Sequence, residues 1–355
     1  MEGKPDWLPG FPVQIYCNRR NHGLPKIKDT DYLFLSTRIK SMERNLLNGE
    51  RLERMLEART PEDAAKVLTE CGWPDMPRVN LDELDRVLTL ERDKTLKDLT
   101  SSAPHPEILE VFKVKYDYHN IKTLLKAEAM GVDPERLLVS AGRVKVEELT
   151  EKLRSGDLRG LPGILQSAAG EAREVLGTTG DPQLADFVLD RACYADMADI
   201  ADRSGSAFLA GYVRITVDTA NLRSVVRTLR MGKGTEFLTG VLFRGGNVDT
   251  GRILSAVSSG GSIEEIYTAS ALREAAAAGA AAIAGGRLTH FEKLCDDAVT
   301  AYLAGARYVA FGEAPLIGYL AARETELTNV RVILSGRLAG LDADTIRERL
   351  RESYV

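Results

Sequence analysis

Hydrophobic and polar residues alternate along most of the chain with the period of an α-helix. Residues 81–99, LDELDRVLTLERDKTLKDL, place apolar side chains three and four positions apart with charges between them, which predicts a helix with one buried face. Helix-start signals recur, each combining a capping residue with a following proline or acid. They begin at Thr60, Asp133, Asp181 and Ser262. The pattern therefore predicts an all-α protein from Asp31 onward.

The first 30 residues differ from the rest of the chain. They contain four prolines and three glycines and show no helical period. We predict an irregular N-terminal extension over residues 1–30, which is ordered only if Trp7 and Phe11 dock on another surface.

Three segments repeat one another. Residues 117–137, 218–238 and 326–346 fall into register without gaps when they are aligned on an asparagine. The asparagines are Asn120, Asn221 and Asn329. An acid stands three residues earlier, at Asp117, Asp218 and Glu326. A glycine follows eleven residues later, at Gly131, Gly232 and Gly340. These positions define an internal structural repeat.

The other shared positions predict a helical hairpin in each copy. Aliphatic residues one, four and five positions after the asparagine share one helix face. The residue two positions after the asparagine is a cation in every copy: Lys122, Arg223 and Arg331. The glycine suits the left-handed end of a helix. Asp133 and Asp342 then cap the second helix, and Gly234 takes that position in the middle copy.

The acid and the asparagine lie on one helix face beside the apolar stripe. We expect both to hydrogen-bond the backbone at the junction with a preceding element. In the first copy they belong to KYDYHNIKTLLKA, residues 115–127, which also contains His119. The other copies have Ala220 and Thr328 at its position. The acid, asparagine and glycine recur in all three copies, whereas the histidine occurs in only one. This indicates a structural role for the stretch rather than a proton-handling site.

The repeat also predicts the domain organisation. Each copy follows a segment of helical character, so the unit is roughly 100 residues long. Plausible joints are the glycine-rich stretch 155–163 and the stretch from 258–262 to the alanine run at 275–286. After the extension of residues 1–30, we expect three helical repeat domains, covering residues 31–157, 158–260 and 261–355.

Composition narrows the function. The 355 residues carry 47 basic and 52 acidic side chains, a net charge of −5, which argues against a nucleic-acid binder. The four cysteines are scattered without a C-x-x-C pair, as in reduced cytosolic proteins. The most apolar run, residues 275–286, is too short to span a bilayer. No secretory signal pattern opens the chain. We therefore expect no direct membrane span.

Candidate chemical motifs are weak. The glycine-rich loop LFRGGNVDTGRIL, residues 242–254, resembles a phosphate cradle but lacks the G-x-x-x-x-G-K-[ST] pattern and a preceding strand. The four histidines lack metal-ligand spacing. Neighbouring acids such as Asp296 and Asp297 are typical of a solvated helix face, and no nucleophile motif is present. We therefore predict no catalytic residue, no cofactor and no metal.

The repeat and the C-terminal sequence resemble a known family, the C subunits of V/A-type ATPases, which are related to the d subunit of the eukaryotic V-ATPase. The resemblance rests on VFKVKYDYHNIKTLLKA (111–127), GEAPLIGYLAARETELTNVRVILSGRLAG (312–340) and, more weakly, DYLFLSTRIKSMERNLL (31–47). It runs from about residue 31 to the end of the chain.

This resemblance implies a non-catalytic part of a rotary motor. Three similar helical domains would surround a pseudo-threefold axis and form a funnel. The funnel would receive the foot of the central shaft on its wide side and sit on the membrane rotor ring of proteolipid subunits on the other. The protein would then be cytoplasmic, peripheral to the membrane, and would couple ATP synthesis or hydrolysis to H⁺ or Na⁺ transport.

Two other classes stay open at the level of sequence. A generic helical scaffold or adaptor would stack its repeats linearly, although units of roughly 100 residues exceed the roughly 34–47 residues of helical solenoid repeats. A nucleotide-binding enzyme would use the 242–254 loop, and nucleotide-induced thermal stabilisation would distinguish it from the rotor subunit.

Overall fold

The computed structural model describes residues 27–352 together with 354 and 355, and these residues contain helices, turns and loops but no strand. The prediction of an all-α protein is confirmed. Most of the N-terminal extension, including Trp7 and Phe11, lies outside the described residues. The N-terminal helices are α1 (Leu33–Met42), α2 (Gly49–Glu57), α3 (Pro61–Glu70) and α4 (Leu81–Ser102). Thr60 caps α3 as predicted, accepting a hydrogen bond from the backbone N–H of Asp63.

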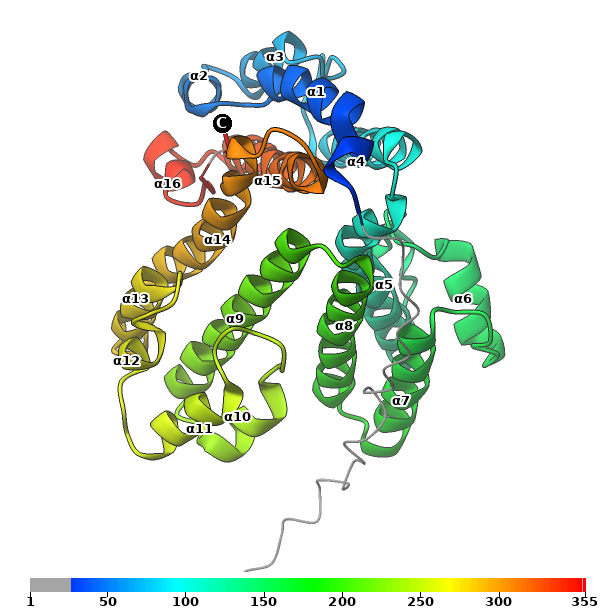
Figure 1. Ribbon diagram of the computed structural model, residues 1–355, viewed down its shortest axis with the longest axis vertical. Helices are drawn as coiled ribbons and strands as arrows, with labels where there is room; N and C mark the ends of the chain where they lie inside the picture. The colour runs from blue at the N-terminus through cyan, green and yellow to red at the C-terminus, as the bar shows by residue number, and fades with distance from the viewer. Residues whose placement is uncertain (1–26, 353) are drawn as a thin grey trace, which may run out of the picture.

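Each copy of the repeat begins on one long helix, and we call these three the repeat helices. They are α5 (Glu110–Met130), α9 (Ala207–Arg230) and α15 (Glu313–Leu338). Each follows another long helix, and we call these the leading helices. They are α4, α8 (Pro182–Ser204) and α14 (Leu288–Ala304). The remaining helices connect these pairs (Figure 1): α6 (Val146–Ser155), α7 (Gly163–Thr179), α11 (Thr250–Ser258), α12 (Ile263–Tyr267) and α13 (Arg273–Ile283).

The three repeat helices end in the same way, at the predicted glycine. Gly131, Gly232 and Gly340 adopt φ angles of 65°, 67° and 73°, which a side chain would strain. The next residue then donates its backbone N–H to a carbonyl five positions back. These bonds are Val132 to Ala127 (3.1 Å), Lys233 to Thr228 (3.1 Å) and Leu341 to Gly336 (3.0 Å). The prediction of a left-handed helix end is confirmed in each copy.

The second arm of the predicted hairpin is shorter than expected. It is α10 (Thr235–Val241) in the second copy, α16 (Ala343–Arg347) in the third and only a 3₁₀ turn, Glu135–Leu137, in the first. Asp342 caps α16 as predicted. The first copy has less room for a helix because its chain returns to the repeat asparagine after 19 residues, compared with 22 in the other copies.

The repeat helices pack in a closed cycle. α5 packs against α8, α9 packs against α14, and α15 packs against α4 (Figure 1), so each repeat helix contacts the leading helix of another unit. The repeated cation forms an ion pair at each contact. These pairs are Lys122 with Asp190 (2.6 Å), Arg223 with Glu292 (2.5 Å) and Arg331 with Asp85 (2.6 Å). The third unit thereby contacts the helix that leads into the first.

The hydrophobic core has three parts, each built around the aliphatic stripe of one repeat helix. The stripe of α15, including Leu327 and Val330, packs with Met55, Leu68 and Trp73 from the N-terminal part of the chain. The first predicted joint lies between α6 and α7, whereas the second, which begins at the end of α11, contains the short helix α12. The boundaries of the three domains stay a prediction.

Candidate functional site

The three repeat asparagines make the same pair of hydrogen bonds. Each side-chain amide accepts from the backbone N–H and donates to the backbone carbonyl of a single downstream residue. Asn120 holds Val139 (2.9 and 2.8 Å), Asn221 holds Phe243 (2.7 and 2.8 Å), and Asn329 holds Arg351 (2.9 and 3.0 Å). All three asparagines are buried. Each fastens the returning chain to its repeat helix, and we call this arrangement the asparagine clamp.

The acid three residues earlier fixes the same returning chain in the first two copies. Asp117 accepts from the backbone N–H groups of Arg143 (2.9 Å) and Val144 (3.1 Å). Asp218 accepts from those of Asn247 (3.0 Å) and Val248 (2.9 Å). These donors stand four and five residues after the clamped residue in both copies.

The third copy differs, because Glu326 accepts from the backbone N–H of Leu47 (2.9 Å), between α1 and α2. The expectation that acid and asparagine bind a preceding element was therefore wrong for the asparagines and for both aspartates. Their partners lie downstream, because the chain turns at the helix end and runs back beside the helix that carries them.

This arrangement also requires a glycine that was not predicted from the sequence. Gly142 and Gly246 each stand three residues after the clamped residue, directly against the repeat aspartate. A Cβ atom would lie 2.3 Å from an Asp117 oxygen at Gly142 and 2.1 Å from an Asp218 oxygen at Gly246. The signal was present in VSAGRV (139–144) and FRGGNV (243–248). The two glycines align only when a three-residue gap is placed in the first copy, after the segment that aligns without gaps.

Gly246→Ala is therefore expected to destabilise the protein, by about 1–3 kcal/mol, because the added methyl displaces the Asp218 carboxylate from its donors. Gly240→Ala is the matched control, since nothing lies within 4 Å of a Cβ there and the residue is in α10. Urea unfolding of both variants checks the prediction. Equal stability for the two would contradict the tight packing of Gly246 against Asp218.

The 242–254 loop is the same returning chain in the second copy. Its backbone N–H groups at Phe243, Asn247 and Val248 are bonded to Asn221 and Asp218. Asp249 caps α11 through the N–H of Arg252 (3.0 Å). A phosphate needs free N–H donors, and the carboxylate of Asp218 already occupies the place where such donors converge. The loop is therefore part of the scaffold.

The other candidate metal-binding or acid–base residues lie far apart or already bond other groups of the protein. Among residues 27–352, 354 and 355, no group of three or more His, Cys, Asp or Glu side chains could hold a metal ion. His119 bonds the carbonyl of Leu137 (2.9 Å). Asp296 pairs with Arg223 (2.5 Å), and Asp297 accepts from the N–H of Glu352 (2.9 Å). No helix in this described part of the chain is long and apolar enough to cross a bilayer.

A cavity of about 310 Å³ lies where the three repeat helices approach one another, and we call it the central cavity. The position five residues before the asparagine lines it in every copy, as Lys115, Thr216 and Glu324. Residues of α8 and α14 complete the wall, among them Tyr194, Asp296 and Thr300. Equivalent positions of the repeat therefore face a common space.

The central cavity has a polar wall between the first and third repeat helices. Glu324 accepts hydrogen bonds from Lys115 (2.5 Å) and from the hydroxyl of Tyr116 (2.8 Å). Burial opposes ionisation of the Glu324 carboxyl, but the Lys115 ammonium and the Tyr116 hydroxyl outweigh it and hold its pKa below the ordinary value. In the second copy the equivalent residue, Thr216, is uncharged.

These features define a helical scaffold protein whose repeated polar residues fix its own backbone around a central space. The model of the ATP synthase (C/AC39) subunit family matches residues 35–349. The chain belongs to this family and is a non-catalytic subunit of a rotary ATPase.

Individual relatives align with this chain over nearly its whole length. The C subunit of the V-type sodium ATPase of Enterococcus hirae is 24% identical over 327 residues, which cover 91% of this chain and 99% of the relative. The C subunit of the A-type ATP synthase of Methanocaldococcus jannaschii is 25% identical over 350 residues, with coverage of 90% and 86%. The C subunit of the V-type ATP synthase of Deinococcus radiodurans is 25% identical over 362 residues, with coverage of 94% and 95%.

Proposed function

We propose that this subunit links the central shaft of the ATPase to its membrane rotor ring, and that the central cavity receives the foot of the shaft. The observation that carries the proposal is the shared lining of the cavity. Lys115, Thr216 and Glu324 come from three different units but occupy one position of the repeat. A shaft end inserted there contacts all three units at once.

The cyclic packing supports a pseudo-threefold, funnel-shaped arrangement of the three units. Each repeat helix contacts the leading helix of another unit, and α15 closes the cycle on α4. A ring of this kind distributes a torque over all its interfaces. An open linear stack, as in a solenoid adaptor, leaves its terminal units without a second neighbour.

The clamps supply the stiffness that torque transfer needs. When its loops are hydrogen-bonded to its helices, a subunit that transmits torque deforms less, so more of the applied rotation reaches its partner. In the first two copies the returning chain is held by an asparagine and an aspartate, whose hydrogen bonds are mostly buried or partly buried. Buried hydrogen bonds of this kind resist local opening.

The face away from the shaft then sits on the cytoplasmic side of the rotor ring. In this position the subunit is peripheral to the membrane and is held there by protein contacts. It couples ATP synthesis or hydrolysis in the head to H⁺ or Na⁺ transport in the ring. The names of its relatives include a sodium ATPase and several ATP synthases.

Binding experiments with the purified protein test this function. It is expected to bind both the purified shaft subunits and the detergent-solubilised rotor ring of its own ATPase, and to hydrolyse no ATP alone. Sedimentation and a phosphate-release assay measure the two properties. Hydrolysis that is sensitive to substitutions in the 242–254 loop, or binding to neither partner, would contradict the proposal.

A further inference from the structure

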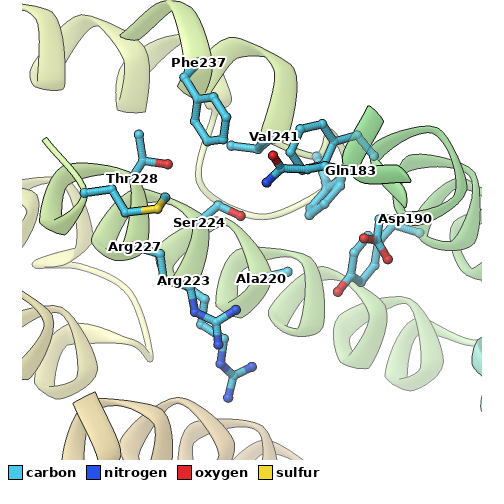
Figure 2. Close-up of a pocket in the computed structure, with 13 residues that line it drawn as sticks. Gln183, Asp190, Ala220, Arg223, Ser224, Arg227, Thr228, Phe237 and Val241 are labelled. Atoms are coloured by element: carbon cyan, nitrogen blue, oxygen red, sulfur yellow. The ribbon is translucent and has the colours of Figure 1, made fainter. Parts of the chain in front are cut away.

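A second pocket, of about 320 Å³, lies between α8, α9 and α10 (Figure 2). Its size is near the lower end of the roughly 300–1,000 Å³ of ligand pockets. Four aromatic side chains form part of its wall, Phe187, Tyr194, Phe237 and Phe243, beside polar and charged residues such as Gln183, Asp190 and Thr228. Phe187 and Phe237 meet edge to face with ring centroids 6.0 Å apart. Figure 2 shows Phe237 and Val241 on one side of the space and Ala220 and Ser224 on the other.

The repeat explains why this pocket exists in the second unit. Ala220 stands directly before its asparagine, and Val241 stands two residues before the clamped Phe243. The equivalent residues of the first unit are His119 and Leu137, and there the imidazole spans the gap to donate a hydrogen bond to the Leu137 carbonyl (2.9 Å). Alanine has no side chain to do so. The second unit thus leaves open a space that the first unit bridges with a side chain.

The lining indicates the chemistry of an occupant. Aromatic walls around a small residue suit an apolar side chain of phenylalanine, leucine or methionine size. The heads of Arg223 and Arg227 turn toward α14 (Figure 2), where they pair with Glu292. At the Phe237 wall, the Lys233 ammonium lies 4.0 Å from the ring centroid. Lys233 favours a carboxylate next to the inserted apolar side chain.

The pocket adjoins the central cavity. Tyr194 and Arg223 line both spaces. The two spaces therefore share part of their lining, and a polypeptide seated in the central cavity contacts two residues of the pocket wall. This continuity favours the polypeptide that fills the cavity over an unrelated small molecule.

We propose that the pocket is an anchor site for the shaft, which inserts an apolar side chain beside Ala220 and pairs a neighbouring carboxylate with Lys233. The inference rests on the proposed function of the central cavity. The anchor site makes the contact with the shaft asymmetric among the three similar units, because the pocket is open in the second unit and bridged by His119 in the first. Such a contact distinguishes the second unit from the first when the shaft docks.

Ala220→His tests the anchor site, because it restores the residue of the first unit. The imidazole is expected to bridge the pocket to the Val241 carbonyl and to leave the melting temperature unchanged or raised. Affinity for the purified shaft subunits is expected to fall by about tenfold or more. Ala220→Ser, which leaves the pocket open, is the matched control and is expected to bind like the original protein.

Lys233→Glu provides a second, exposed variant that does not depend on repacking. It is expected to weaken shaft binding, with a smaller salt dependence than the original protein shows. Isothermal titration measures all variants beside Thr216→Trp, which blocks the central cavity. Full affinity of both Ala220→His and Lys233→Glu, with loss of binding in Thr216→Trp, would overturn the anchor site and leave the proposed function standing. Full affinity of all three would overturn both.

Discussion

Asn221→Ala is expected to lower the free energy of unfolding by about 1–3 kcal/mol, because it leaves buried backbone groups of Phe243 without a partner. The wild-type amide satisfies both the N–H and the carbonyl of that residue, at 2.7 and 2.8 Å. Chemical denaturation of the isolated protein measures the loss. Asn120→Ala and Asn329→Ala are expected to lose stability for the same reason, since their amides make equivalent bonds.

His119→Ala is the control for these substitutions. Its imidazole makes a single hydrogen bond, to the Leu137 carbonyl, and the residue is exposed. Such a bond contributes roughly 0.5–1.5 kcal/mol at most, so the loss is expected to be smaller than for any of the asparagines. An unchanged stability in the asparagine variants, with loss of coupled ion transport in His119→Ala, would mean that residues 115–127 are a functional site.

The double variant Thr216→Trp and Thr328→Trp is expected to abolish stable binding of the shaft. Both threonines line the central cavity, and two indole rings occupy much of its volume of about 310 Å³. The hydroxyl of each threonine bonds a carbonyl of its own helix, of Tyr212 and Glu324 respectively. The carbonyls that lose these hydroxyls are part of helical backbone, which keeps its own hydrogen bonds. Complexes rebuilt with this variant are expected to hydrolyse ATP without moving ions.

Thr239→Trp is the matched control for the cavity variant. Thr239 makes the same type of bond, to the carbonyl of Thr235, but lies exposed on α10 outside the central cavity. It is expected to bind the shaft and to transport ions like the original protein. Circular dichroism and the melting temperature establish that each variant is folded. A folded double variant with full shaft affinity would show that the shaft binds elsewhere.

The ungapped repeat predicted the elements that depend on nearby residues. The apolar stripes, the glycine at each helix end and the cap at Asp342 follow from spacing within one or two helical turns, and the structure has all of them. Family membership also followed from the motifs, because they combine the repeat with a characteristic C-terminal helix. Local spacing cannot assign partners across a turn of variable length.

That limit explains the error at the repeat acid and asparagine. Their partners lie 19 to 30 residues downstream, after a turn whose length differs between copies. Glu326 instead reaches Leu47, 279 positions away in the sequence. The ion pairs of Lys122, Arg223 and Arg331 join different units. Such long-range contacts depend on how the units pack. The repeat in the sequence therefore predicted the position of each cation but not its acidic partner.

We propose that one cavity, lined by the same repeat position in three units, holds the shaft. Photo-crosslinking in the assembled ATPase tests it most directly, with a benzophenone side chain placed at Thr216, at Thr328 and, as a control, at Thr239. After illumination and mass spectrometry, the two cavity positions are expected to give crosslinks to one shaft polypeptide, and Thr239 is expected to give none to it. Crosslinks from Thr216 and Thr328 only to the rotor ring, or only within this chain, would contradict the account.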